Sequence, residues 1–381
     1  MSRLLDLAID LQQIPAPTFQ EAARAEFVRK RFTDEGLADV DMDSTGNVYA
    51  RLRGSGSGKA LVVSAHLDTV FPACVDLQLQ REPEPRARSG TTARILGPGI
   101  GDNSLGVAAL FGLVWALRER NTALPGDLWL AANVCEEGLG DLRGMKSVVS
   151  RFGVVPVPAR GGTTPLAYIV LEGLGLGHIY HRGLGVRRYR ISIHTSGGHS
   201  WIDYGQPSAI HELAALSARL AALELPKKPR TTLNIGVISG GSSVNTIAAE
   251  AMLELDLRSE EVGTLAALVG QVEQMVQAAR KPGVQVEAEI IGERPSGGIP
   301  QEHPLVRLAQ DCLREVGIEP HLSTGSTDAN LPLSLGLPAV TICLTTGGRA
   351  HSAQEFINIP PLEKGLEQVV NLVSKVWDIK T

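Results

Sequence analysis

Apolar segments with the character of buried strands alternate along this chain with segments that have helical spacing. The strand-like segments include residues 60–66, 127–137, 166–173 and 337–346, and residues 106–120 have the periodicity of an amphipathic helix. Strands that lack a polar face are covered on both sides, as in sheets whose crossover connections are helices. The sequence therefore predicts an α/β fold in which helices cover both faces of a sheet.

The middle of the chain has a different pattern. Residues 186–196 (VRRYRISIHTS) alternate between polar and apolar, which is typical of a strand with one wet face. A helix, two strands, a second helix and a further strand follow, the order β-α-β-β-α-β of a ferredoxin-like domain. Glycine-rich joints at 173–185 and 295–300 flank this stretch and suit domain boundaries. We predict a domain inserted at 184–293, with the enclosing domain formed by 1–183 and 294–381.

Composition excludes several classes of protein. The 381 residues carry a formal net charge of -5 without a block of basic residues, which argues against nucleic acid as a partner. No apolar run approaches the ~18 residues of a membrane span, and the N-terminal segment reads as an amphipathic helix rather than a signal peptide. Four scattered cysteines show no C-x-x-C pair, so we expect a reducing, cytoplasmic location.

Acids and histidines gather where the predicted strands end. His66 and Asp68 close one strand, Glu136 and Glu137 another, and Glu172 a third. Asp102 precedes the helix, and His351 follows the last strand. One such residue is usually a helix cap or a structural histidine. Ligands of open α/β sheets bind at the carboxyl ends of the strands, and five converging stretches are hard to explain as caps.

Carboxylates and imidazoles are zinc ligands, and two Zn²⁺ ions would carry four positive charges. Asp102, Glu137 and Glu172 with one hydroxide would balance them. Glu136 then remains without a metal and is free to handle a proton. Asp68 would share a strand face with His66 and could accept a hydrogen bond that orients the imidazole and raises its basicity. A turn-forming role is the alternative, but the nearby His66 favours the orienting role.

These stretches resemble a known family, the co-catalytic zinc peptidases and amidohydrolases. It includes peptidase T, glutamate carboxypeptidase, aminoacylase and succinyl-diaminopimelate desuccinylase. The resemblance is carried by SAHLDTV, GPGIGDNSLGVAAL, NVCEEG, VLEG, GGHS, STDAN and GGRAHS, which run from residue 64 to 352. It implies a mixed sheet of the zinc-peptidase type and an inserted domain that acts as a lid and often as a dimer interface.

The resemblance also implies roles for single residues. Asp102 would bridge two zinc ions, Glu136 would be the general base, and the other ligands would be His66, Glu137, Glu172 and His351. Three residues of the inserted domain would contact the reacting groups. His199, often supplied by the partner subunit, would stabilise the oxyanion, and Arg258 and Asn245 would grip the substrate. Without the resemblance, His199 is a loop histidine and Arg258 a member of a surface ion pair.

The expected function is hydrolysis of a peptide or N-acyl amide bond in a small substrate with a free carboxylate. A metal-bound water would be the nucleophile and Glu136 the general base. The glutamate at position 172 resembles the residue type of the carboxypeptidase and aminoacylase branches at this position. The segment STDANLPLSLGLPAVT instead resembles the peptidase T branch. An aminopeptidase or tripeptidase is therefore the alternative. A ligand-binding protein on the same fold and a glycosidase with paired carboxylates are further alternatives. Cobalt or manganese could replace zinc.

Overall fold

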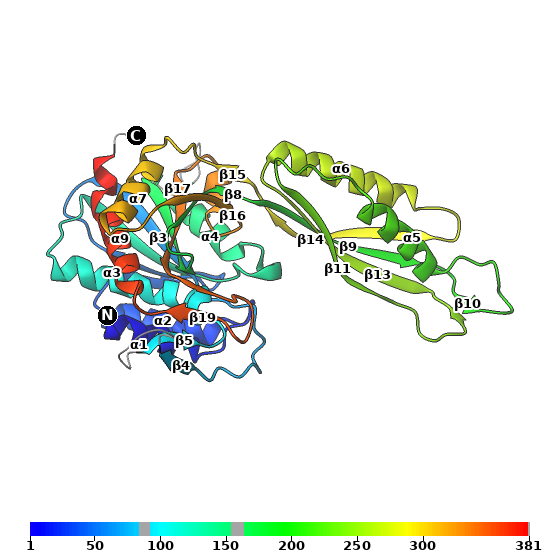
Figure 1. Cartoon of the computed structure of the whole chain (residues 1–381), viewed down its shortest axis with the longest axis horizontal. Coiled ribbons are helices and arrows are strands. Elements are labelled where there is room, and N and C mark those ends of the chain that lie inside the picture. Colours follow the sequence, from blue (N-terminus) through cyan, green and yellow to red (C-terminus); the bar gives the residue numbers. More distant parts are fainter. Residues whose placement is uncertain (84–91, 154–163, 380–381) are drawn as a thin grey trace. The chain divides into compact units, whose positions relative to one another are not determined.

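The computed structural model describes residues 1–83, 92–153 and 164–379, which form two compact units (Figure 1). The enclosing unit comprises Met1–Gly183 and Gly298–Thr381, and the inserted unit comprises Leu184–Gly297. Each unit has its own cluster of buried apolar side chains. The second boundary lies at 297, so residues 294–297, which the sequence places in the enclosing domain, belong to the inserted unit.

A mixed sheet forms the centre of the enclosing unit, and nine strands contribute to it among the described residues. Along most of its width the order is β1-β2-β6-β3-β7-β17-β8, and β16 pairs with β8. The strands are β1 (Ala38–Met42), β2 (Val48–Leu52), β3 (Gly58–His66), β6 (Gly126–Asn133), β7 (Ala167–Leu174), β8 (His178–Gly183), β15 (Gly297–Gly298), β16 (His321–Gly325) and β17 (Ala339–Thr345). The neighbours β6, β3, β7 and β17 are parallel, so their carboxyl ends meet at one edge.

Helices cover both faces of this sheet, as the sequence predicts. They are α1 (Ser2–Gln12), α2 (Ala22–Asp34), α3 (Gly106–Glu119), α4 (Arg143–Phe152), α7 (Pro304–Glu315), α8 (Asn330–Ser334) and α9 (Leu362–Lys375). In Figure 1, α3 and α9 lie on one side of the sheet, where they pack on β3 and β17, and α4 packs on β6 from the other side. The mixed α/β architecture is thereby confirmed.

The helix after Asp102 is long and apolar. By length and composition, Ile100–Glu119 would suffice to cross a membrane, which the sequence reading missed. Its most apolar window is 83% buried inside the protein, however, and it packs on β3 and α1. The helix is therefore accounted for as the core helix of this unit.

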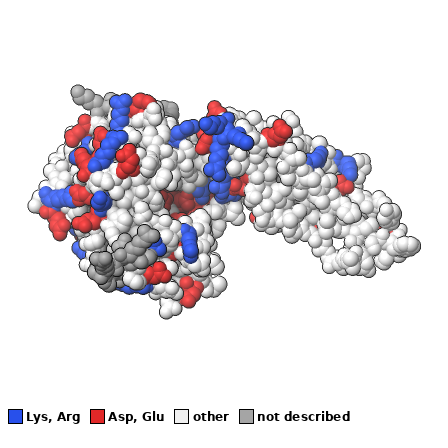
Figure 2. Space-filling model, viewed as in Figure 1, with Lys and Arg blue, Asp and Glu red and all other residues white. Residues whose placement is uncertain are grey.

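Over the part of that unit visible in Figure 2, basic and acidic side chains are interspersed.

The inserted unit has the predicted element order. It contains β9 (Gly185–His194), α5 (Ala209–Ala221), β11 (Thr231–Gly240), β13 (Glu250–Ser259), α6 (Val262–Ala278) and β14 (Gln285–Arg294), with the short strands β10 (Gly198–His199) and β12 (Thr246–Ile247). The four long strands form an antiparallel sheet in the order β11-β13-β9-β14. Both helices pack on β9 and β13 and on each other, so they share one face of this sheet.

A smaller sheet lies apart from the central one in the enclosing unit. It has the order β18-β19-β5-β4 and consists of β4 (Gln80–Pro83), β5 (Thr92–Leu96), β18 (Gly347–Gly348) and β19 (Phe356–Asn358). Phe356 pairs with Leu96 and Ile357 with Ile95. This pairing brings the segment that carries His351 beside the segment that leads to Asp102.

The separate core of the inserted unit predicts that residues 184–297 fold alone. Its first and last long strands are neighbours, with Val186 opposite Arg294, so the fragment's ends lie close together. We expect the fragment to unfold cooperatively when followed by circular dichroism. Leu253→Ala, which removes a fully buried side chain, should lower its free energy of unfolding by ~2–5 kcal/mol. The exposed Val262→Ala should change it by less than ~0.5 kcal/mol. A fragment without a cooperative transition would contradict the prediction.

Candidate metal centre

The parallel strands bring the predicted ligands to one edge of the central sheet. His66 is the last residue of β3, and Glu172 is the sixth of the eight residues of β7. Ser64 pairs with Val170, so His66 and Glu172, each two residues farther on, reach the same level. Glu137 follows β6, and His351 lies beyond β17, between the short strands β18 and β19.

Glu136 and Glu137 lie beyond the strand that the sequence assigned to them. The strand β6 ends at Asn133, and Cys135 has a left-handed backbone with φ 57°. The alternation of strand faces therefore does not decide where the two glutamates point. A turn sets their orientation, and both are buried, at 5% and 6% exposed.

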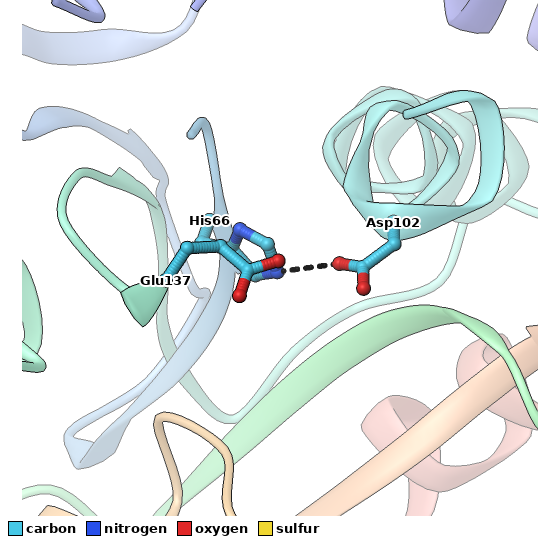
Figure 3. A group of neighbouring side chains, drawn as sticks. All are labelled: His66, Asp102 and Glu137. Atoms are coloured by element: carbon cyan, nitrogen blue, oxygen red, sulfur yellow. Dashed lines mark ion pairs between the residues drawn. The ribbon is translucent and has the colours of Figure 1, made fainter. Parts of the chain in front are cut away.

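Asp102 stands between the two histidines. Its Oδ1 lies 3.1 Å from His66 Nε2, and its Oδ2 lies 3.1 Å from His351 Nε2. Each histidine has a second carboxylate: Glu172 Oε2 is 3.6 Å from His66 Nε2, and Glu137 Oε1 is 3.2 Å from His351 Nε2. Figure 3 shows His66, Asp102 and Glu137 turned toward one another. One ligand atom from each of these residues lies within 4.8 Å of those of the other two. The side chains thus divide into two histidine–carboxylate pairs that share Asp102.

This spacing fits a pair of divalent ions. Bonds of ~2.0–2.2 Å to oxygen and nitrogen at tetrahedral angles put neighbouring ligand atoms ~3.3 Å apart. The four nitrogen–oxygen distances lie between 3.1 and 3.6 Å. The donors are carboxylate and imidazole, which suit zinc and its neighbours in the first transition row. One ion would take His66, Glu172 and Asp102 Oδ1, and the other His351, Glu137 and Asp102 Oδ2.

The concentration of acids shifts the pKa values of Glu172, His66 and His351. Burial raises the pKa of Glu172 to about 7. Burial alone would lower the pKa of His66, but Glu172 and the hydrogen bonds to Asp102 and Asp68 hold it well above its usual value. Hydrogen bonds to Asp102 and Glu137 raise the pKa of His351 to about 10. Positive charge is therefore strongly favoured here, whether from protonated imidazoles or from metal ions.

Asp68 connects the histidine to the two glutamates. The Oδ1 and Oδ2 atoms accept hydrogen bonds from the main-chain N–H groups of Glu136 and Glu137, each at 2.9 Å, and Oδ2 accepts a third from the Thr18 hydroxyl. His66 Nδ1 lies 3.0 Å from the main-chain oxygen of Asp68 and 3.5 Å from its carboxylate. The carboxylate thus acts mainly on the turn that carries both glutamates, a contact that sequence spacing did not indicate.

Asn103 ties the Asp102 segment to β7, and sequence reasoning missed it. Its fully buried amide donates to Leu171 O at 2.8 Å, and its Oδ1 accepts from the N–H groups of Gly173 and Gly106 at 3.1 Å. The two main chains come so close that a Cβ on Gly173 would lie 2.0 Å from Gly101 O. A polar residue directly after a candidate ligand was the available signal.

Comparison with known proteins agrees with this geometry. Residues 62–375 match the model of Peptidase family M20/M25/M40. The chain belongs to this family. Family M20/M25/M40 enzymes are hydrolases of peptide or amide bonds, and the resemblance noted in the sequence is thereby confirmed.

Several relatives within the family match over much of the chain. A Bacillus subtilis protein, YqjE, is 25% identical over 98% of both chains, and a succinyl-diaminopimelate desuccinylase of Gluconobacter oxydans is 27% identical over 86% of this chain and 83% of its own. A probable carboxypeptidase of Aspergillus clavatus is 30% identical over 68% of this chain and 58% of its own.

Solved structures share the fold along the whole chain. A tripeptidase from Staphylococcus aureus has a TM-score of 0.79 at 21% identity and covers 99% of both chains. A dinuclear metal-binding M20 peptidase from Bacillus subtilis has a TM-score of 0.68 at 18% identity and covers 99% of this chain and 98% of its own.

Two of the three candidates in the inserted unit lie close together. His199 of β10 pairs with Thr246 of β12, and Asn245 O accepts a hydrogen bond from Ser200 N at 3.0 Å. His199 Nδ1 accepts the N–H groups of Trp201 and Ile202 at 3.2 and 3.4 Å. In the neutral ring the proton is therefore on Nε2, which leaves that atom as a donor.

Arg258 lies apart from these two residues. It is near the end of β13, whereas the β10–β12 ribbon adjoins the start of that strand, so eight residues of strand place them roughly 25 Å apart. Arg258 Nε donates to Asp256 Oδ2 at 2.6 Å, and Arg188 Nε donates to the other oxygen at 2.9 Å. The ion pair considered from the sequence is thus present.

The shared position of Asp102 predicts a distinctive metal stoichiometry. The loaded protein should hold about two divalent ions per chain by plasma mass spectrometry. Asp102→Ala should lose both, because both pairs need its carboxylate, whereas His351→Ala should lose about one. Retention of both ions by Asp102→Ala would rule out bridging. Circular dichroism should confirm that both variants remain folded.

Proposed function

We propose that this protein is a dinuclear metallohydrolase that cleaves a peptide or N-acyl amide bond in a small substrate carrying a free carboxylate, with zinc as the metal. The observation that carries the proposal is Asp102, whose two oxygens each face a different histidine–carboxylate pair. The Bacillus subtilis neighbour, described as a dinuclear metal-binding peptidase, supports the pair of ions.

The enclosing unit would supply the hydrolytic chemistry. Two bound ions would polarise the scissile carbonyl and lower the pKa of a water molecule to near ~7. Glu136 would take the proton of the attacking water and pass it to the leaving amine. Asp68 would hold the turn of Glu136 and Glu137 through its two main-chain hydrogen bonds, so that base and ligand keep a fixed relation.

The inserted unit would supply substrate contacts. His199 Nε2–H would donate to the oxyanion and Asn245 would assist it, while Arg258 would bind the substrate carboxylate with paired hydrogen bonds. Because one copy of the unit holds His199 and Arg258 roughly 25 Å apart, we assign them to different copies in a homodimer. The desuccinylase and carboxypeptidase relatives support a substrate with a free carboxylate.

A tripeptidase or aminopeptidase is the second candidate. The Staphylococcus aureus tripeptidase shares the fold over 99% of the chain, which supports it. The two candidates differ in the terminus of the peptide that must be free. A carboxylate-directed enzyme needs the C-terminus, and an aminopeptidase needs the N-terminus.

The proton-transfer role predicts a separation of turnover from metal binding. Glu136→Gln should lower kcat by ~10²–10⁴-fold, because general acid–base help has that magnitude. Its metal content should stay at about two ions. Glu137→Gln is the matched control, since it changes the adjacent acid, and it should lose metal. A Glu136→Gln protein depleted of metal would show that Glu136 is a ligand.

If Arg258 recognises the substrate carboxylate, removing the carboxylate and removing the arginine should lower kcat/KM by similar factors. Amidating the substrate's C-terminus should reduce kcat/KM far more than acetylating its N-terminus. Arg258→Ala should reduce kcat/KM about as much as amidation and keep the metal content. Arg190→Ala is the control, because Arg190 forms a similar ion pair with Glu254 on the same sheet. Cleavage of C-terminally blocked peptides together with a strict need for a free N-terminus would instead favour the tripeptidase.

A further inference from the structure

Glu355 is a buried acid that has no part in the proposed reaction. It lies four residues after His351, immediately before β19, and is 0% exposed. Its Oε1 accepts hydrogen bonds from the main-chain N–H groups of Gly101 at 2.7 Å and Asp102 at 2.9 Å. Its Oε2 is buried and has no hydrogen-bond partner among the residues that the structure describes. A buried carboxylate costs free energy unless its contacts compensate for lost hydration, so these contacts require an explanation.

The main chain of Glu355 joins the same two segments. Its N–H donates to Ser352 O at 2.9 Å, and its carbonyl accepts from Gly97 N at 2.8 Å. One residue thus closes the turn after His351 and holds both ends of the Gly97–Asp102 segment. Asp102 and His351 are 249 positions apart in the chain, and their side chains meet at 3.1 Å beside this connection.

The two side-chain bonds fall where the direction of Asp102 is determined. Orienting its carboxylate requires a fixed main chain at residues 101 and 102. Without the acceptor oxygen of Glu355, the main-chain N–H groups of Gly101 and Asp102 would lose their partner, which costs free energy in a buried segment. A shift of a few tenths of an ångström in the main chain at residues 101 and 102 would move both oxygens of Asp102. The contacts of both histidine–carboxylate pairs would change with them.

We propose that Glu355 is a positioning residue that clamps the main chain of Gly101 and Asp102, so that each oxygen of Asp102 faces its own histidine. The proposal rests on the dinuclear site proposed above. Glu355 acts through hydrogen-bond acceptance at Oε1; its negative charge is not what the site needs.

Two conservative variants separate acceptance from charge. Glu355→Gln keeps an acceptor oxygen at the same reach and removes the charge. Glu355→Asp keeps the charge and withdraws the oxygens by ~1.5 Å, the length of one C–C bond. Titration of the metal-free proteins with Co²⁺, followed by its visible absorption, reports both affinity and ligand geometry.

Loss of the clamp should lower metal affinity by ~10–100-fold, the usual effect of removing a partner that orients a ligand. We expect this loss and an altered Co²⁺ spectrum in Glu355→Asp, and near-normal affinity and spectrum in Glu355→Gln. Asp43→Ala is the control for general destabilisation. Asp43 accepts the N–H groups of Thr45, Gly46 and Asn47 in another turn. Its loss should lower the melting temperature and leave Co²⁺ affinity unchanged.

Hydrogen exchange of the metal-free protein tests the clamp without any metal. In the peptide covering 97–105, the amide hydrogens of Gly101 and Asp102 should exchange about 10-fold faster or more in Glu355→Asp than in the unmodified protein. In Glu355→Gln they should exchange at the rate of the unmodified protein. Equal protection in both variants, or a Glu355→Gln variant impaired like Glu355→Asp, would overturn the proposal. If the unmodified protein failed to bind two ions, the proposed dinuclear function would be wrong. Hydrogen exchange would still show whether Glu355 holds the main chain of Gly101 and Asp102.

Discussion

Mutual repulsion of carboxylates at one sheet edge is the constraint around which the enclosing unit is built. Asp68, Asp102, Glu137 and Glu172 all reach the edge where β3, β6, β7 and β17 end. Acids in such a place are tolerable only when paired, hydrogen-bonded or bound to a cation. The donors that meet this charge include two main-chain N–H groups and the Thr18 hydroxyl on Asp68, and one imidazole on each oxygen of Asp102. Parallel strand pairing concentrates the charge, and the histidines divide it into two pairs.

The main buried strands followed from the sequence because apolar runs and titratable residues are local signals. The end of β3 at His66 and the inserted β-α-β-β-α-β order were both readable from periodicity. The turn at Glu136 and Glu137 was not readable. Its shape depends on the left-handed backbone of Cys135 and on the hydrogen bonds to Asp68, 68 and 69 positions away. Periodicity carries no information about such a turn.

The residues that support the candidate ligands were hidden for a related reason. Asn103 and Glu355 are polar, fully buried and defined by partners far away in the chain. Neither has a spacing that would distinguish it from a loop residue. For His199, Asn245 and Arg258, the sequence suggested a proximity that the structure shows for only two of them. Sequence placed them in one domain, but only the register of β13 shows that Arg258 is at the other end.

The close approach of Gly173 to Gly101 changes how members of the family should be compared. With 2.0 Å between a built Cβ and the carbonyl oxygen, even alanine at position 173 would push the strand of Glu172 away from the segment of Asp102. A homologue could keep all five candidate ligands and still be unable to assemble the centre. The presence of the candidate ligands is therefore an incomplete test of whether a homologue can assemble the centre. The glycine at position 173, which has no side chain, should be checked as well.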